Sequence, residues 1–253
     1  MNNLRKYGEG PFSVAVIHGG PGAAGEIGPV AKKLSKSLGV LEPIQAAISL
    51  EGQVEELKNV LQENAELPIT LIGFSWGAWL SFIVAARYPS IIKNLILIGS
   101  GPFEEEYAAT IDNTRLSRLS KEEIVEFESI FKNLDDAAFA RLGELVLKTD
   151  SYEPITEEAE KIDFNIDIFR SVWPEAAKMR SSGELLELAR QIKCPVIAIH
   201  GNYDPHPAEG VRKPLSANIE NFEFFLLKNC GHKPWIERQA KEEFFKIIKE
   251  NLS

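Results

Sequence analysis

A serine between two glycines is the first residue of this sequence whose type and spacing indicate chemistry. The stretch GFSWG at residues 73–77 fits the pattern G-x-S-x-G, in which the serine, here Ser75, lies on a sharp turn from a strand to a helix. A β-prone apolar run at residues 69–72 precedes the turn, and apolar residues at helical spacing follow it at residues 79–86. The helix behind the serine favours a nearby anion. The pattern predicts a nucleophile, although a glycine turn between a core strand and a core helix would look the same.

Other reactive residue types follow the ends of other predicted strands. Asp204 comes after a strand at residues 194–200, His232 after one at 223–227, and the loop HGGPG, residues 18–22, after the first clear strand. In open parallel sheets, ligands bind beyond the carboxyl ends of the strands. A serine, an aspartate and a histidine in this chain order suit nucleophilic catalysis of acyl transfer.

The three side chains have distinct predicted roles. Ser75 is a weak nucleophile unless a base takes its proton, and His232 is the predicted base because an imidazole titrates near neutral pH. Asp204 is predicted to hold the tautomer of that imidazole and to stabilise the imidazolium. Two alternatives stay open: His206 is a rival base, and Glu104, after the preceding strand, is a rival acid.

The tetrahedral intermediate of acyl transfer carries an oxyanion that needs two N–H donors. One predicted donor is the backbone N–H of Trp76, directly after the nucleophile. The other should come from the HGGPG loop. Pro21 has no N–H, so Gly20 is the first candidate there and Gly22 the second.

The remaining residues of the glycine motifs are predicted to shape the loops rather than to react. Glycines on either side of the serine leave space where a side chain would clash with the turn. His18 and His200, both at strand ends, are expected to support their loops rather than to transfer protons. The predicted elbow and loop set is His18, Gly19, Gly22, Gly73 and Gly77.

Strands and helices alternate through the first hundred residues, from the strand at residues 13–18 to the strand at 94–99. This order predicts an α/β fold with a mostly parallel sheet of about six strands flanked by helices. The alternation stops after the fourth clear strand. Residues 102–190 are charged and helix-prone, show no convincing strand, and form too long a segment for a simple crossover. We expect a core of residues 1–101 and 191–253 and a helical cap inserted at 102–190.

Prolines and glycines set the finer expectations. Residues 24–37 read as a helix interrupted at Gly28-Pro29, and Pro234 is expected to start the closing helix. Residues 1–12 are short and polar, which predicts at most a small edge strand.

The strand-end motifs together resemble those of the α/β-hydrolase superfamily. They are HGGPG at 18–22, GFSWG at 73–77, HGNYD at 200–204 and CGHKPW at 230–235. The HGGPG loop is most similar to that of the proline iminopeptidases and their relatives, and the resemblance covers roughly residues 13–102 and 190–252. It implies an α/β-hydrolase fold whose variable helical cap lies over the site. The elbow departs from the GGSWG typical of iminopeptidases, and the amino-terminal strand pair usual in the family is missing or vestigial.

Composition excludes several classes of protein. The chain of 253 residues has a net charge of -9, which argues against nucleic acid as a partner. It contains no run of 18 apolar residues, and its start lacks the apolar region of a secretory signal, so we expect a cytoplasmic protein without a membrane partner. Cys194 and Cys230 are predicted to be free thiols at opposite ends of the sheet. No CxxC or HExxH motif is present, and we expect neither a metal nor a cofactor. The oligomeric state is not indicated.

The charge is concentrated in the predicted cap. Residues 101–190 hold 21 Asp and Glu and 11 Lys and Arg, whereas the rest of the chain holds 16 and 17. A solvated surface explains such an excess, and so does a cap that attracts a cationic substrate such as a free amino terminus. The leading prediction is a serine hydrolase that cleaves a small ester or amide through an acyl-enzyme, similar to carboxylesterases. The alternatives are an iminopeptidase-type aminopeptidase and, from another class, a non-catalytic small-molecule receptor on the same fold.

Overall fold

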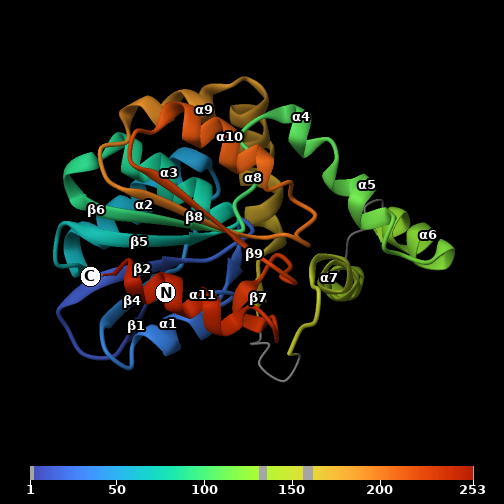
Figure 1. The fold of residues 1–253 in the computed structure, drawn as a ribbon, viewed down its shortest axis with the longest axis horizontal. Coiled ribbons are helices and arrows are strands. Elements are labelled where there is room, and N and C mark those ends of the chain that lie inside the picture. Colours follow the sequence, from blue (N-terminus) through green and yellow to red (C-terminus); the bar gives the residue numbers. More distant parts are fainter. Residues whose placement is uncertain (1–2, 131–135, 156–161, 253) are drawn as a thin grey trace.

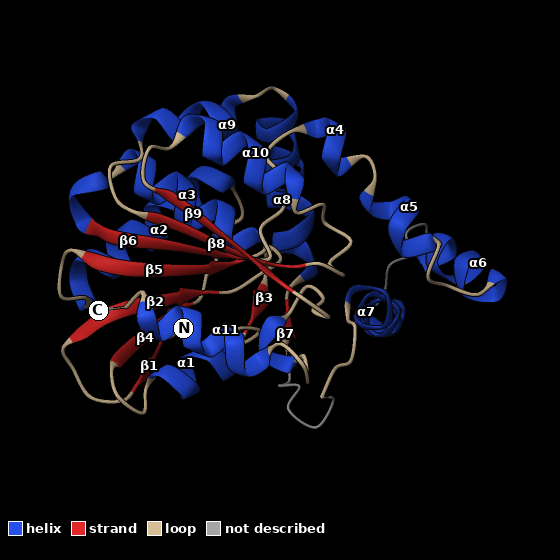
Figure 2. Ribbon diagram, in the orientation of Figure 1, coloured by secondary structure: helices blue, strands red, loops and turns tan. Residues whose placement is uncertain are grey.

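A seven-stranded sheet forms the centre of the protein, with helices on both faces (Figure 1, Figure 2). The computed structural model describes residues 3–130, 136–155 and 162–252. In spatial order the strands are β1 (Leu4–Tyr7), β4 (Gly39–Pro43), β2 (Phe12–Ile17), β5 (Ile69–Phe74), β6 (Ile92–Ile98), β8 (Val196–Gly201) and β9 (Phe222–Leu227). Neighbouring strands are parallel except for the edge strand β1, which is antiparallel to β4. The carboxyl ends of the parallel strands therefore lie along one edge of the sheet.

Some of the helices lie in short connections between the strands or after the last strand, and the others lie in one long segment between β6 and β8. They are α1 (Gly28–Leu34), α2 (Leu50–Asn64), α3 (Trp76–Arg87), η1 (Pro89–Ile91), α4 (Glu105–Ala108), α5 (Ile111–Leu116), α6 (Lys121–Ile130), α7 (Asp136–Asp150), α8 (Ile166–Ser181), α9 (Glu184–Glu187), η3 (Leu188–Gln191), α10 (Glu209–Asn218), η4 (Pro234–Ile236) and α11 (Lys241–Glu250). A second, two-stranded sheet joins β3 (Ala23–Ala24) to β7 (Asp163–Phe164) in antiparallel register.

The central strands are apolar on both faces because each face is covered by helices. Successive residues of β2 point to opposite sides, so Val14 and Val16 pack with one core cluster while Ala15 and Ile17 pack with the other. The first cluster includes residues of α1 and α11, and the second includes residues of α2 and α3. This burial fixes the register of the strands and hence the positions of the loops that follow them.

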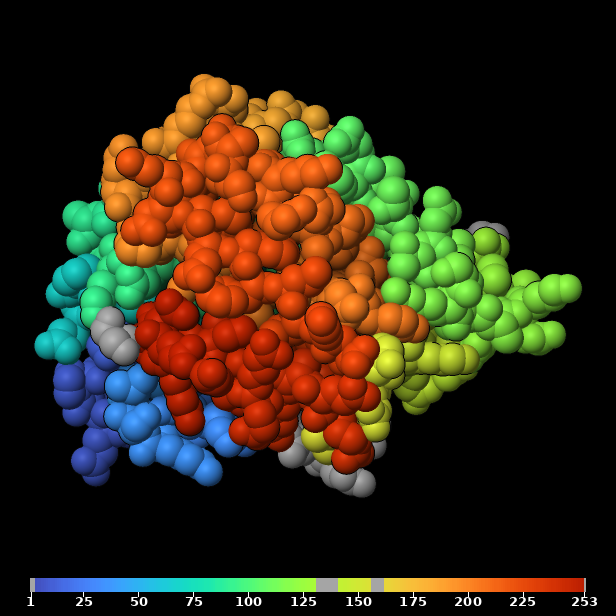
Figure 3. Space-filling model, viewed as in Figure 1, coloured from blue at the N-terminus to red at the C-terminus, as the bar shows by residue number. Residues whose placement is uncertain are grey.

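The insertion between β6 and β8 has two parts. Helices α8 and α9 pack back onto the body of the molecule, where α8 contacts α2 and residues of α8 join the core cluster of α2 and α3. Helices α4, α5 and α6 extend away from the sheet, and the space-filling view shows this green segment projecting beyond the body (Figure 3). A small apolar cluster of Phe127, Ile130 and Leu145 holds α6 against α7.

The α/β fold with a mostly parallel, helix-flanked sheet is confirmed. Several details differ from the sequence-based expectation. The helix expected over residues 24–37 begins only at Gly28, because Pro29 occupies its first turn, where no intrahelical N–H is needed. Pro234 starts the short turn η4 rather than α11. The insertion does contain a strand, β7, and α10, which has Pro214 inside it, was not predicted.

None of the helices in the described part of the chain combines the length and the apolar character needed to cross a bilayer. Both cysteines are buried free thiols.

Candidate active site

Ser75 is the single residue between β5 and α3. Its backbone has φ 52° and ψ -114°, a region that residues with a side chain rarely adopt. A Cβ at Gly73 would meet the backbone of Gly77, and a Cβ at Gly77 would meet the carbonyl oxygens of Ile17 and His18. The two glycines therefore allow the first turn of α3 to pack tightly between β5 and the end of β2. This packing brings Ser75 beside the loop that follows β2.

His18 holds the start of that loop. Its side chain is buried, and the backbone N–H of Gln45 points at its Nε2 at 3.4 Å. Because Nε2 accepts, Nδ1 carries the proton and donates to the carbonyl of Gly19 at 2.9 Å. Burial lowers the pKa of His18, which keeps the imidazole neutral in this role. The contacts of His18 with backbone groups agree with the expectation that it supports the loop.

The other end of the loop is bonded to the insertion. Gly22 has φ 87°, and its carbonyl accepts the backbone N–H of Asn165 at 2.9 Å. Asn165 also caps α8, since its side-chain oxygen accepts the N–H groups of Asp167 and Ile168. Together with the pairing of β3 and β7, these bonds join the HGGPG loop to the start of α8.

His232 and Asp204 meet in a short hydrogen bond. Nδ1 of His232 lies 2.7 Å from Oδ2 of Asp204, whose side chain is fully buried. The ring of His232 packs against Phe74, with the ring centroids 4.8 Å apart. Because Phe74 directly precedes Ser75, His232 lies beside the elbow. Nδ1 thus faces the acid, as it must if Nε2 is to act as a base.

Asp204 also binds His206. Oδ1 of Asp204 accepts the backbone N–H of His206 at 2.9 Å and lies 2.7 Å from its Nδ1. The rings of His206 and His232 stack with centroids 4.4 Å apart and an interplanar angle of 22°. Sequence reasoning treated His206 as a rival of His232, but the structure gives both imidazoles the same acid. The hydrogen bond from His232 goes to Asp204 and not to Glu104, which was the rival acid.

Burial and hydrogen bonding shift several of these groups away from their ordinary titration. Burial lowers the pKa of His206 to about 4, against the opposing attraction of Asp204. Burial alone would raise the pKa of Asp204, but the three histidines around the carboxylate, His232, His206 and His200, hold it well below its ordinary value. At neutral pH the arrangement is therefore an ionised carboxylate that accepts hydrogen bonds from two imidazoles, of which His206 is neutral.

The shifts predict that the protein loses stability on mild acidification. An unfolded histidine titrates near 6.5, so below that pH the unfolded chain takes up protons that folded His206 and His18 take up less readily. Stability should fall as the pH drops from about 6.5 towards 4, and His206 alone supports a loss of about 2 kcal/mol between pH 7 and pH 4.5. The lowered pKa of Asp204 acts separately, because its contribution is lost only below the ordinary range of a carboxyl group.

Urea unfolding at a series of pH values measures this loss. His206→Asn should show a smaller decrease between pH 7 and 4.5 because it removes an imidazole whose pKa is lowered to about 4. Unfolding midpoints that stay constant over the range in the wild-type protein would contradict the prediction.

The end of α7 contacts the loop that carries His232. The backbone N–H of His232 donates to the carbonyl of Asp150 at 2.7 Å. The carboxylate of Asp150 accepts two bonds from the guanidinium of Arg115, at 2.9 and 2.6 Å. Burial raises the pKa of Asp150, but the bonds to Arg115 outweigh it and leave the pKa below its ordinary value. The Asp150–Arg115 ion pair of the insertion is thus joined to the candidate base through the backbone bond between Asp150 and His232.

Glu237 connects the same two segments. It is fully buried, and its Oε1 accepts the backbone N–H groups of Gly231 and Tyr152, each at 2.8 Å. Oε2 accepts the N–H of Glu153, also at 2.8 Å. Three charge-assisted bonds therefore fasten the residue before His232 to the residues that follow α7.

Glu237→Gln should destabilise the protein by about 1–3 kcal/mol, because the amide group replaces one acceptor oxygen with a donor that faces a backbone N–H. Urea unfolding measures the change, and Glu242→Gln, an exposed residue of α11, is the matched control. Equal stability of the two variants would show that the three bonds do not hold the segments together.

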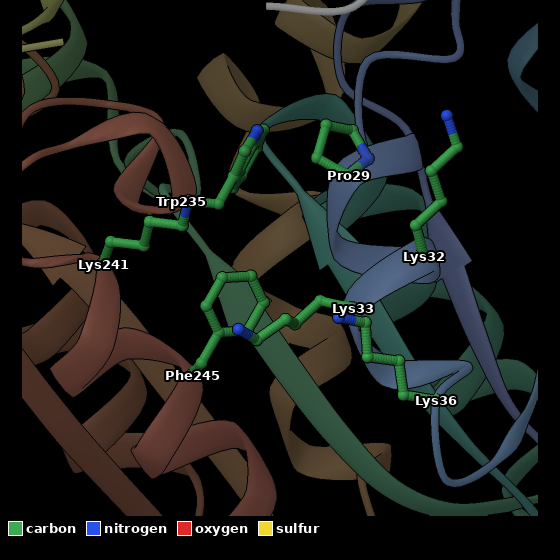
Figure 4. A pocket seen from close by; sticks show the side chains of 7 residues that line it. All are labelled: Pro29, Lys32, Lys33, Lys36, Trp235, Lys241 and Phe245. Carbon is green, nitrogen blue, oxygen red and sulfur yellow. The ribbon is translucent and has the colours of Figure 1, made fainter. Parts of the chain in front are cut away.

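A separate hollow of about 260 Å³ lies between α1 and α11, away from these residues. Figure 4 shows Lys33 reaching towards the ring of Phe245, with Trp235 above them. Four lysines line it together with Pro29, Trp235 and Phe245: Lys32, Lys33, Lys36 and Lys241. It includes none of the residues predicted to react, so the candidate site is defined by the strand ends and not by this hollow.

The structure therefore brings Asp204 and His232 into contact and places both the elbow of Ser75 and the HGGPG loop close by. Sequence reasoning missed Asp150 and Glu237, which hold the His232 loop through backbone groups. A buried glutamate five residues after a candidate base, in GHKPWIE, carries no distinctive signal in a single sequence.

A parallel sheet with a serine elbow, an aspartate and a histidine at its strand ends is typical of the α/β hydrolases. The model of the alpha/beta hydrolase fold family matches residues 42–239, and the chain belongs to that family.

Known relatives include esterases and peptidases. The chain is 26% identical over 204 residues to monoacylglycerol lipase ABHD6 of Bos taurus, covering 77% of this chain and 58% of the relative's length. It is 23% identical over 260 residues to the pimeloyl-[acyl-carrier protein] methyl ester esterase of Chromobacterium violaceum, covering 98% and 97% of the two chains. It is 22% identical over 258 residues to the proline iminopeptidase of Lactobacillus delbrueckii subsp. bulgaricus, covering 89% and 85%.

Solved structures share the fold. MenH from S. aureus superposes with a TM-score of 0.71 at 18% identity, covering 100% of this chain and 98% of that chain. At this identity the likeness shows the fold, and the chemistry must be argued from the site itself.

Proposed function

We propose that the protein is a serine hydrolase that cleaves a small ester or amide through an acyl-enzyme. The observation that carries the proposal is the His232–Asp204 bond of 2.7 Å, made by a ring that packs on the residue before Ser75. With Nδ1 donating to an ionised carboxylate, Nε2 of His232 is left as an acceptor for the proton of the Ser75 hydroxyl.

The proposed reaction has two acyl-transfer steps. Oγ of Ser75 attacks the substrate carbonyl while Nε2 of His232 takes its proton, and the imidazolium then protonates the leaving alcohol or amine. Water attacks the resulting ester of Ser75, again with His232 as the base, and releases the acid and the free serine. Asp204 stays ionised throughout and stabilises the imidazolium formed in each step.

The backbone N–H groups of Trp76 and Gly20 are the proposed oxyanion donors. Trp76 begins α3, and the helix N-terminus also favours negative charge beside Ser75. Gly22 was the second candidate in the loop, but its carbonyl is bonded to Asn165 and the space beside its Cα is filled by that residue. These contacts pack Gly22 against the insertion, and Gly20 stays the proposed donor.

The insertion keeps an excess of acidic residues, but the carboxylate that lies beside the His232 loop, Asp150, is paired with Arg115 and is not free to bind a cationic substrate. Many of its acidic side chains are paired: Glu105 with Arg180, Glu123 with Lys148, Glu126 and Glu144 with Arg141, and Asp150 with Arg115. Asp150, which lies behind His232, is thus neutralised within the protein. The leading version of the proposal is therefore a carboxylesterase-like enzyme. The iminopeptidase alternative is favoured by the HGGPG loop and by the relative from Lactobacillus delbrueckii subsp. bulgaricus.

A hydrolysis panel tests the proposal. It sets p-nitrophenyl esters of increasing acyl length beside amino-acid naphthylamides, including that of proline, with Ser75→Ala as the blank. We expect ester turnover and little or no turnover of the naphthylamides. Turnover of free-amine amides that stops when the amine is blocked would instead make the protein an aminopeptidase.

A serine-directed phosphonate separates an enzyme from a binding protein on the same fold. The enzyme should take up one phosphonate at Ser75 at neutral pH, detected by intact mass, and Ser75→Ala should take up none. A wild-type protein that is not labelled would support the non-catalytic receptor.

A further inference from the structure

The carboxylate of Asp204 makes short bonds to two imidazoles, and Nε2 of a third, His200, lies 3.4 Å from its Oδ2. Oδ2 lies 2.7 Å from Nδ1 of His232, and Oδ1 lies 2.7 Å from Nδ1 of His206. The backbone N–H of His206 also donates to Oδ1, at 2.9 Å. The oxygen that His232 does not use is therefore fully engaged.

The geometry fixes which atoms carry protons. An ionised carboxylate only accepts hydrogen bonds, so each Nδ1 must donate. Nε2 of His200 lies 2.8 Å from the carbonyl of His206, which only accepts, so His200 donates there and fixes the backbone of His206. Pro205 and Pro207 flank His206 and restrict its φ angle and those of its neighbours. The bond from His200 and the two prolines thus hold the backbone of His206 so that its Nδ1 faces Asp204.

The ring of His206 also contacts the ring of His232. The two stack with centroids 4.4 Å apart, and the Phe74 ring contacts His232 at 4.8 Å. The candidate base is therefore packed against two rings while its Nδ1 is tied to Asp204. Rotation of the imidazole out of this position requires loss of the hydrogen bond and of both ring contacts.

We propose that His206 is a positioning residue for His232: it occupies Oδ1 of Asp204, leaves Oδ2 as the acceptor for His232, and stacks on the imidazole that moves the proton. The inference rests on the proposed function, because it assigns His206 to the same reaction. His206 touches neither Ser75 nor the substrate in this role.

The role requires His206 to stay neutral while His232 becomes charged. The charged and titratable groups that act on it are Asp204, His232, His200 and the Arg115–Asp150 pair. Burial, together with His232 and Arg115, opposes a proton on its Nε2, and the carboxylates of Asp204 and Asp150 favour one. A neutral His206 donates to Asp204 without repelling the imidazolium.

Removal of this donor should change the charge that Asp204 presents to His232. With only the backbone N–H of residue 206 left on Oδ1, more of the carboxylate charge favours the imidazolium form of His232, so a more alkaline solution is needed to free the base. The carboxylate would also be less well oriented, which lowers the rate of proton transfer.

Two substitutions separate the donor from the ring. His206→Phe keeps a ring against His232 but loses the N–H, whereas His206→Asn keeps a side-chain N–H near the position of Nδ1 and loses the ring. For a p-nitrophenyl ester we expect His206→Phe to lower kcat about tenfold, with KM little changed, and to move the acid limb of the rate profile to higher pH. His206→Asn should keep the limb of the wild type and at least about a third of its kcat.

Proton NMR provides a readout that needs no turnover. The wild type should show two far-downfield imidazole N–H resonances, from His232 and His206, and His206→Phe should lose one of them while His206→Asn retains that of His232. A wild-type rate and acid limb in His206→Phe would overturn the inference, as would an equal loss in both variants with no movement of the limb.

The inference and the proposed function fail in different ways. If the wild type neither hydrolyses any ester or amide of the panel nor takes up the phosphonate, the proposed function fails and the role of His206 falls with it. The wild type can instead hydrolyse an ester and take up the phosphonate while His206→Phe keeps the wild-type rate and acid limb, or while both variants lose activity equally with no movement of the limb. In that case only the role of His206 is overturned.

Discussion

Ser75→Ala should lower kcat for the best ester of the panel by at least about a thousandfold, by analogy with the effect of removing a nucleophile from a catalytic triad. The reason is that no acyl-enzyme can form, and only the oxyanion donors and substrate binding remain. Progress curves at high enzyme concentration, together with intact mass after phosphonate treatment, measure the loss.

Ser100→Ala is the matched control for this experiment. Ser100 also follows the end of a central strand, β6, and is buried, with its hydroxyl donating to the carbonyl of Gly101. Its replacement should leave kcat within about threefold, since no reacting group is removed. A wild-type rate in Ser75→Ala would exclude Ser75 as the nucleophile.

The backbone at Ser75 adds a prediction on stability. Glycine adopts φ 52° and ψ -114° without the clash that a Cβ causes there, so Ser75→Gly should be as inactive as Ser75→Ala and about 1 kcal/mol more stable. Urea unfolding of the two variants side by side measures the difference, and equal stability would mean that the turn carries no strain.

Asp204→Asn should have an effect of similar size, a loss of about a thousandfold or more in kcat/KM. An asparagine has one acceptor and one donor group where two imidazoles now donate to a carboxylate. One histidine must then move its proton to Nε2, and a His232 protonated there can no longer accept the proton of Ser75. The variant also loses the charge that stabilises the imidazolium.

Glu104→Gln is the control for Asp204→Asn, because Glu104 was the alternative acid on sequence grounds. We expect kcat/KM of this variant to stay within about twofold of the wild type. Retained activity in Asp204→Asn combined with a large loss in Glu104→Gln would reverse the assignment of the acid.

The strand-end residues could be predicted because their signals are local. The elbow is a short motif with its strand and helix attached, and burial on both faces makes the central strands continuous apolar runs. The parallel order then places the ends of these strands along one edge, so Asp204 and His232 could be expected to meet before any coordinates were known.

The shared acid could not be predicted in the same way. His206 lies two residues from Asp204, and sequence spacing alone allows it to compete with His232, to point to solvent or to support the loop. The choice depends on side-chain rotamers and on a hydrogen bond from His200 to the backbone of His206. Such details follow from packing around the loop and leave no periodic pattern in the sequence.

Contacts between segments that are distant in the sequence could not be predicted either. The pairing of β3 with β7 involves two residues on each side, which is too short for any strand pattern to be visible. The bonds from Glu237 go to backbone groups, so the residues that it binds need no particular side chain. The division into core and cap remains a prediction, since the insertion is bonded to the core at several points.

Those bonds have a consequence for how the protein would be inactivated. The end of α7 is bonded to the His232 loop through the carbonyl of Asp150. The residue before α8, Asn165, is bonded to the HGGPG loop through Gly22. Heat or a protease that detaches the insertion would therefore disturb both loops together. Loss of activity should precede loss of the sheet, and an assay of function would report a lower apparent melting temperature than circular dichroism does.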